Sequence, residues 1–128
     1  MITIPISHKD SIITCAVEFK GHKGNQILHM GIDTGATYTI IPVETAILIG
    51  CNPVIPTRRI EIIMGGSTEY LPVVRVPDVR IFGAELKKIE VICHNLPPKS
   101  PVHGLLGLNI LRYFDIWFKF KSNILEIS

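Results

Sequence analysis

The sequence predicts an all-β domain, and three observations support this prediction. Alternating and β-branched segments recur along the whole chain. Glycine- and proline-rich turn signals separate them at short intervals, and only one long segment carries both the start and the stop signal of a helix. The chain has 128 residues, 47% of them apolar, which suits one compact core and leaves little room for another. We therefore expect a single domain, residues 1–128.

The first quarter of the chain predicts a terminal strand and a hairpin. Residues 2–6 (ITIPI) alternate, and Pro5 confines such a strand to the edge of a sheet. Residues 11–20 and 26–33 flank the loop GHKGN, whose glycines and asparagine suit a hairpin turn. This hairpin would deliver Asp33 at the end of its second strand.

The next segment predicts the main helix. Pro42 stands at a plausible first helical position and Gly50 lies just beyond the last one, so residues 42–50 fit a helix of about two turns. Residues 51–57 carry two prolines and are expected to form a loop.

The second half of the chain predicts further hairpins. Residues 58–64 and 68–76 bracket Gly65-Gly66-Ser67, a tight reversal in which the glycines can take positive φ, and this hairpin is expected to protrude. The remaining expected elements are a hairpin of residues 79–82 and 86–94 around Gly83, a proline-dense loop at 95–103, an apolar segment at 104–111 leading into a short helical turn near Tyr113, and a terminal hairpin around 121–123.

Three aromatic side chains carry expectations about packing. Trp117 and Phe118 are expected to pack in the core and at an interface. Tyr70 suits a half-buried strand position.

Composition argues against several classes of protein. The net charge is only +2 and no charge run is present, so nucleic acid is not an expected partner. Five dispersed histidines without CxxC, HxxxH or HExxH spacing predict no metal site, and we expect no cofactor. The three cysteines suit buried, reduced thiols. No signal peptide or membrane span is visible, which predicts a soluble cytoplasmic protein that does not bind membranes.

The stretch GIDTGATYTIIP, residues 31–42, places Asp33 between an apolar strand and a turn of small residues. Gly35 has no side chain to block a second backbone, and the hydroxyl of Thr34 is free to bond a neighbouring loop. A second small motif, Leu105-Leu106-Gly107, could pack a glycine against this turn. The tripeptide alone is weak evidence, and its alternative is an ordinary turn.

Together, GIDTGATYTIIP and the later GLLGLNIL resemble the signature of the retropepsin-like aspartic proteases, half-length relatives of pepsin. The order of the expected elements matches that family over most of the chain. The resemblance implies a closed, acid-protease-like β-barrel of a single lobe, with one or two short helices and a flap hairpin.

The resemblance also implies a role for each matching residue. Asp33, Thr34 and Gly35 would form the catalytic triplet. Asp33 would be the catalytic carboxylate, and Thr34 would brace the turn by a hydrogen bond to its partner loop. Ala36, Gly65, Gly66 and Ser67 would belong to the flap and substrate-binding surface, and Leu106 and Gly107 would support the catalytic loop from beneath. The resemblance also gives the alternative for Tyr70, which is to line a substrate cleft as flap aromatics do. Leu108 departs from the arginine that retroviral enzymes commonly carry, whereas Asn109 matches a polar residue often found next.

Peptide hydrolysis by this route needs two carboxylates that share one proton. Of the four aspartates, only Asp33 lies in such a turn, so the second acid must come from another chain. We expect a homodimer that cleaves a peptide or protein substrate between two copies of Asp33. Residues 2–6 and 124–127 could interleave across that dimer or pair within one chain. Two alternatives stay open: a peptide-binding or dimerisation domain that keeps the fold without cleaving, and a strand-rich regulatory domain with a fortuitous DTG.

Overall fold

The computed structural model describes residues 1–128, apart from the side chain of Met64. Half of the residues lie in strands and 9% in helices. In chain order the elements are β1 (Ile2–Pro5), β2 (Thr14–Lys20), β3 (Asn25–Ile32), β4 (Ile40–Ile41), α1 (Val43–Ile49), β5 (Arg58–Met64), β6 (Ser67–Ile81), β7 (Ala84–Cys93), β8 (Gly104–Leu106), α2 (Leu108–Leu111), β9 (Ile116–Lys119) and β10 (Ile124–Ile127).

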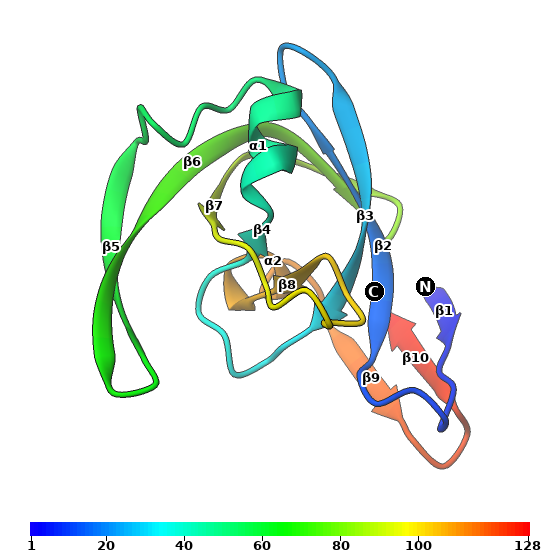
Figure 1. Cartoon of the computed structure of the whole chain (residues 1–128). Coiled ribbons are helices and arrows are strands. Elements are labelled where there is room, and N and C mark those ends of the chain that lie inside the picture. The colour runs from blue at the N-terminus through cyan, green and yellow to red at the C-terminus, as the bar shows by residue number, and fades with distance from the viewer.

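Six strands close into a barrel in the order β2-β3-β8-β4-β7-β6, because β6 also pairs with β2. Strand β5 is added to the outside of β6, and Figure 1 shows this pair curving away from the barrel. The main core fills the barrel with fully buried side chains such as Phe19, Met30 and Leu106. The predicted all-β class and closed barrel are confirmed.

Strand β8 is threaded between two strands that precede it in the chain. It runs parallel to β3, with Met30 opposite Gly104, and antiparallel to β4, with Ile40 opposite Leu105. At Gly104 a Cβ atom would lie 2.2 Å from the carbonyl oxygen of Ile40, so only glycine fits there without a shift of the backbone. This threading brings the segments after β3 and after β8 together.

A separate three-stranded sheet has the order β1-β10-β9. Strand β1 pairs with β10 of the same chain, with Ile2 opposite Ile127. Of the two arrangements left open for the terminal segments, this is pairing within one chain. Leu125 of β10 is fully buried, so the sheet rests on the rest of the molecule through that strand.

The hairpin of β5 and β6 turns at Gly65 and Gly66, whose φ angles are +55° and +82°. The predicted reversal with positive φ is therefore confirmed. An added Cβ at either glycine would meet nothing within 4 Å, so the tip stands clear of the other described residues. Tyr70 on the returning strand is exposed rather than half-buried, because it lies beyond the part of the hairpin that packs on the barrel.

Residues 68–76 and 79–82, predicted as two strands, lie in the single fifteen-residue strand β6 apart from Phe82, which begins the next turn. Pro77 has no N–H to donate, but Lys88 opposite turns to a φ of +54°. The pairing of Val76 with Ile89 therefore continues in the same register at Asp78. The turn signal of this proline is overridden by pairing on both sides of it.

The helices and the tryptophan show smaller differences. Helix α1 ends at Gly50, whose φ is +91°, as predicted, and Pro42 lies one position before its first residue. Helix α2 precedes the predicted turn near Tyr113. Trp117 is 62% exposed and not in the core, because its side of β9 faces away from the barrel. Within the described residues, neither helix has the length and hydrophobicity that a membrane span requires.

The close approach at Gly104 makes a stability prediction. Replacing Gly104 with Ala would push β4 away from β8 and lower the free energy of unfolding by about 2 kcal/mol or more. At Gly24 the nearest atom to an added Cβ is 3.5 Å away, so Gly24→Ala is a control that should change stability by less than about 0.5 kcal/mol. Urea unfolding of both variants measures the difference, and equal midpoints would contradict the proposed constraint.

Candidate active site

The carboxylate of Asp33 is held in a fixed orientation at the end of β3. The N–H of Asp33 donates to the carbonyl of Leu106 (3.0 Å), which ties the turn to β8. The N–H of Gly35 donates to Oδ1 of Asp33 (2.9 Å), and the N–H of Ala36 donates to the Asp33 carbonyl (3.2 Å). The side chain is half-buried, so it combines a defined direction with access to solvent.

The segment after β8 lies directly against this turn. The N–H of Leu108 donates to the carbonyl of Ala36 (2.8 Å), and the N–H of Asn109 donates to the carbonyl of Thr37 (3.2 Å). A Cβ at Gly107 would lie 2.4 Å from the carbonyl carbon of Tyr38, so the two backbones touch at this position. The geometry places Leu106 and Gly107 in contact with the loop that carries Asp33.

A buried polar pair, Thr39 and Asn109, joins the same two segments. The hydroxyl of Thr39 donates to Oδ1 of Asn109 (2.9 Å) and accepts from the N–H of Gly107 (3.1 Å). The N–H of Thr39 also donates to that Oδ1 (2.9 Å), and Nδ2 of Asn109 donates to the carbonyl of Glu90 (2.7 Å). Thr39 is completely buried, and its hydroxyl and N–H both have hydrogen-bond partners. Sequence reasoning missed it, although a threonine inside the apolar run TYTIIP could have signalled a buried partner.

Thr34 points away from these contacts. It is exposed, and no side chain or backbone group among the described residues forms a hydrogen bond with its hydroxyl. Instead it lines an open pocket of about 260 Å³ with four apolar residues: Ile13, Ile32, Phe118 and Phe120. The turn that holds Asp33 therefore borders an apolar surface of the same chain.

The hairpin of β5 and β6 contacts the loop after Asp33 through its stem, not through its tip. Gly65, Gly66 and Ser67 are exposed at the tip. The stem has a small apolar cluster, which joins the hairpin to the loop after Asp33 and to β7: Leu71, Val73 and Ile92 at its centre, with Tyr38, Ile40, Ile60 and Ile62 packed against them. In the view of Figure 1 the tip and the loop after β3 both extend toward the bottom.

The cysteines do not offer a competing nucleophile. All three are buried and free. Burial raises the pKa of Cys15 and that of Cys93 to about 12, which keeps both as thiols at neutral pH. No group of three or more His, Cys, Asp and Glu side chains gathers into a metal-binding arrangement anywhere in the described part of the chain.

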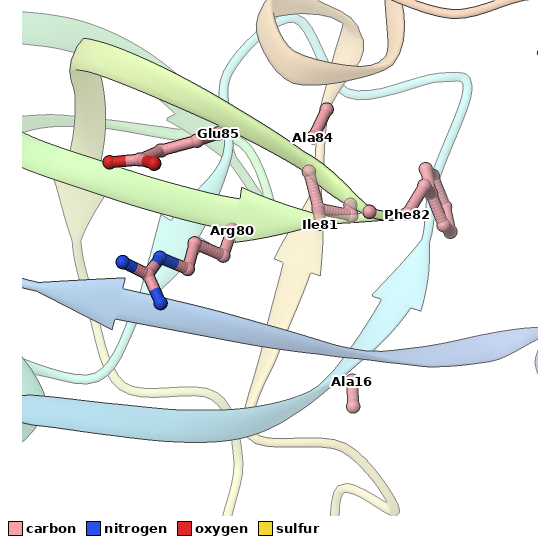
Figure 2. Close-up of a pocket in the computed structure, with 7 residues that line it drawn as sticks. Ala16, Arg80, Ile81, Phe82, Ala84 and Glu85 are labelled. Carbon is pink, nitrogen blue, oxygen red and sulfur yellow. The ribbon is translucent and has the colours of Figure 1, made fainter.

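A pocket of about 390 Å³ lies elsewhere, between β2 and the turn that joins β6 to β7. Figure 2 shows the side chains of Arg80 and Glu85 toward one end and Phe82 toward the other. Its lining includes none of the residues predicted from the sequence to form a site. We therefore place the candidate site at the turn that carries the oriented carboxylate of Asp33.

Comparisons with known proteins agree with the fold described above. The family model described as gag-polyprotein putative aspartyl protease matches residues 17–113. A retropepsin-like aspartic protease from Rickettsia conorii is similar in structure, with a TM-score of 0.72 and 18% identity over 97% of this chain and 86% of that one. The retroviral protease-like domain of Ddi1 from Leishmania major gives a TM-score of 0.58 and 16% identity over 94% of this chain and 90% of that one. A search of curated protein sequences gave no match.

At such low identity the two structures establish the fold alone, whereas the family model spans well over half of the chain. The barrel, the glycine-supported turn and the family match are mutually consistent. The chain belongs to the gag-polyprotein aspartyl protease family and has the retropepsin-like fold.

Proposed function

We propose that this protein is an aspartic endopeptidase that is active as a homodimer. The observation that carries the proposal is the Asp33 carboxylate, oriented by the N–H of Gly35 in a turn that the second glycine motif supports. The family model is described as a putative aspartyl protease and covers residues 17–113, which supports a catalytic role for an aspartate in this segment. The three buried free thiols fit a reducing compartment such as the cytoplasm.

The other aspartates of the chain do not offer a second catalytic acid. Asp10 and Asp115 are exposed and lie outside this turn. Asp78 is paired with Lys87, and the hydrogen bond from that ammonium lowers the pKa of the Asp78 carboxyl. A second copy of Asp33, brought close by a two-fold axis, would complete the pair.

In the proposed reaction, one Asp33 carboxylate takes a proton from water while the water oxygen bonds to the carbonyl carbon of the scissile amide. The other Asp33, protonated, gives its proton to the carbonyl oxygen, which yields a tetrahedral diol. A proton then moves to the amide nitrogen, the C–N bond breaks, and a hydroxyl proton returns to the pair. Two carboxyls that share one proton supply both the base and the acid. An extended peptide would lie between the turn and the hairpin, as an added strand.

The surface next to Thr34 supports a specific place for the dimer contact. Because Thr34 follows Asp33 directly, a two-fold axis near Asp33 also passes near the pocket that Thr34 lines. The rings of Phe118 and Phe120 stack there with their centroids 5.8 Å apart, and Phe120 is 66% exposed. A stacked aromatic pair with one exposed ring, beside an incomplete site, is the kind of surface that a partner subunit covers.

The catalytic role of Asp33 predicts the effect of Asp33→Asn. The amide keeps an oxygen for the Gly35 N–H but cannot act as a base, so cleavage should fall by at least about a thousandfold. Cleavage of a diverse peptide pool, incubated between about pH 4 and 7 and read by mass spectrometry, measures the loss.

Asp10→Asn serves as the control because Asp10 is exposed and distant in sequence from the turn. It should keep full activity. Equal cutting by the wild type and Asp33→Asn would refute the role of Asp33. A folded wild-type dimer that makes no cuts would instead favour a peptide-binding or dimerisation domain.

The proposed dimer surface predicts the effect of Phe120→Asp. A carboxylate in the covered pocket would be buried without a partner, so the variant should dissociate at concentrations where the wild type is dimeric, and activity should fall with it. Light scattering after size-exclusion chromatography measures the molecular mass. Val54→Asp, at a position 77% exposed in the loop before β5, is the matched control and should stay dimeric. A dimeric Phe120→Asp variant would place the contact elsewhere.

A further inference from the structure

Arg58, the first residue of β5, makes three hydrogen bonds that leave its own strand. Its Nε donates to Oε2 of Glu90 (3.3 Å), and its Nη2 donates to Oε1 of Glu90 (3.1 Å). The same Nη2 donates to the phenol oxygen of Tyr38 (3.3 Å), and the guanidinium carbon lies 5.6 Å from the centroid of the Tyr38 ring. One side chain of the hairpin stem thus contacts both β7 and the loop that follows Asp33.

The groups that Arg58 contacts belong to the framework of the candidate site. Tyr38 lies between the turn of Asp33 and β4, and its backbone touches Gly107. The carbonyl of Glu90 accepts from Asn109, which holds Thr39. The link therefore runs from the hairpin stem to the two segments that fix the turn.

An arginine suits this place for physical reasons. Its planar fork bonds both carboxylate oxygens and can face an aromatic ring at the same time, which a lysine cannot do. The hydrogen bonds from Arg58 lower the pKa of the Glu90 carboxyl, because they favour its charged form. The Arg58 side chain is 42% exposed and that of Glu90 is 28% exposed, so the pair contributes little to global stability.

The neighbouring Arg59 provides a contrast within the same strand. It is exposed, and within the described residues its guanidinium forms no hydrogen bond, ion pair or ring contact. The two arginines share their chemistry and their strand, yet only Arg58 reaches the catalytic loop. Its contacts therefore reflect its position on the stem and not merely the presence of a positive charge.

We propose that Arg58 is a positioning residue that holds the hairpin stem on the catalytic loop through Tyr38 and Glu90, and so sets the geometry in which substrate binds. This inference rests on the proposed function. Asp33 keeps its own bonds to Gly35 and Leu106 without Arg58, so the chemical step does not depend on it directly. A substrate bound as a strand between the hairpin and the turn would contact both of them, so loosening the hairpin would weaken substrate binding.

Arg58→Met tests the kinetic part of this inference. It keeps a long apolar stem and removes the charged fork. We expect KM for a cleaved peptide to rise about tenfold while kcat changes less than about twofold, because substrate binding and not the reacting carboxylate is affected. Arg59→Met should leave both values unchanged. Arg58→Lys should recover only part of the loss, and a KM unchanged in Arg58→Met would overturn the inference.

A double-mutant cycle with Tyr38→Leu tests whether Arg58 acts through Tyr38. The double variant should raise KM by clearly less than the product of the two single effects, because either change removes the same contact. Effects that multiply independently would show that the two residues act separately and would refute the proposed link.

Hydrogen–deuterium exchange tests the same link and does not require that the protein cleaves a peptide. Amides in residues 60–63 and 68–71 should exchange faster in Arg58→Met than in the wild type or Arg59→Met, while the melting temperatures stay similar. Unchanged exchange there would overturn the inference. If the wild type cleaves no peptide, the proposed function fails, and this exchange difference still decides whether Arg58 holds the stem.

Discussion

The structure depends on the passage of β8 between β3 and β4 at backbone contact distance. No Cβ fits at Gly104 beside Ile40, or at Gly107 beside Tyr38. The N–H of Asp33 can reach the carbonyl of Leu106 because these backbones meet. A carboxylate at the end of an isolated strand would sample many directions, whereas here the backbone of Asp33 is held by Leu106 and its carboxylate accepts from the N–H of Gly35. Preorganisation of that kind is what general acid–base chemistry requires.

The buried pair of Thr39 and Asn109 turns this contact into a single defined arrangement. Apolar packing alone tolerates small slides between surfaces, but a buried hydroxyl and amide lose about 1 kcal/mol or more for each hydrogen bond that a slide breaks. The carboxamide of Asn109 has bonds on both its oxygen and its nitrogen, and the hydroxyl of Thr39 both donates and accepts. The pair therefore fixes the relative position of the turn and α2, which apolar contact would leave less precise.

The features predicted correctly from the sequence are those specified by local signals. Alternation, a glycine pair at a turn and a glycine after a helix each act within a few residues. The structure has the predicted barrel hairpins, the turn at Gly65-Gly66 and the helix end at Gly50. The errors arose where distant residues decide the outcome. Lys88 allows β6 to continue past Pro77, and the role of Thr39 depends on Asn109, seventy positions away. The exposure of Trp117 depends on how the terminal sheet rests on the barrel. Neither a short window of sequence nor a motif contains information about these contacts between distant residues.

In the proposed mechanism, the one oriented carboxylate of each chain is half of a hydrolytic pair, so the activity of such a protein would depend on its assembly. For a monomer, the chemistry described above has a base or an acid but not both, so its rate would follow the concentration of dimer and not of chain. The pocket bordered by Thr34 lies next to Asp33 in the chain, so the surface that would bring two chains together would adjoin the carboxylate that would do the chemistry. Any change that weakens association at that surface would then also misplace the carboxylates. Assembly and catalysis would be a single event in such a protein, and protein concentration would be sufficient to switch it on.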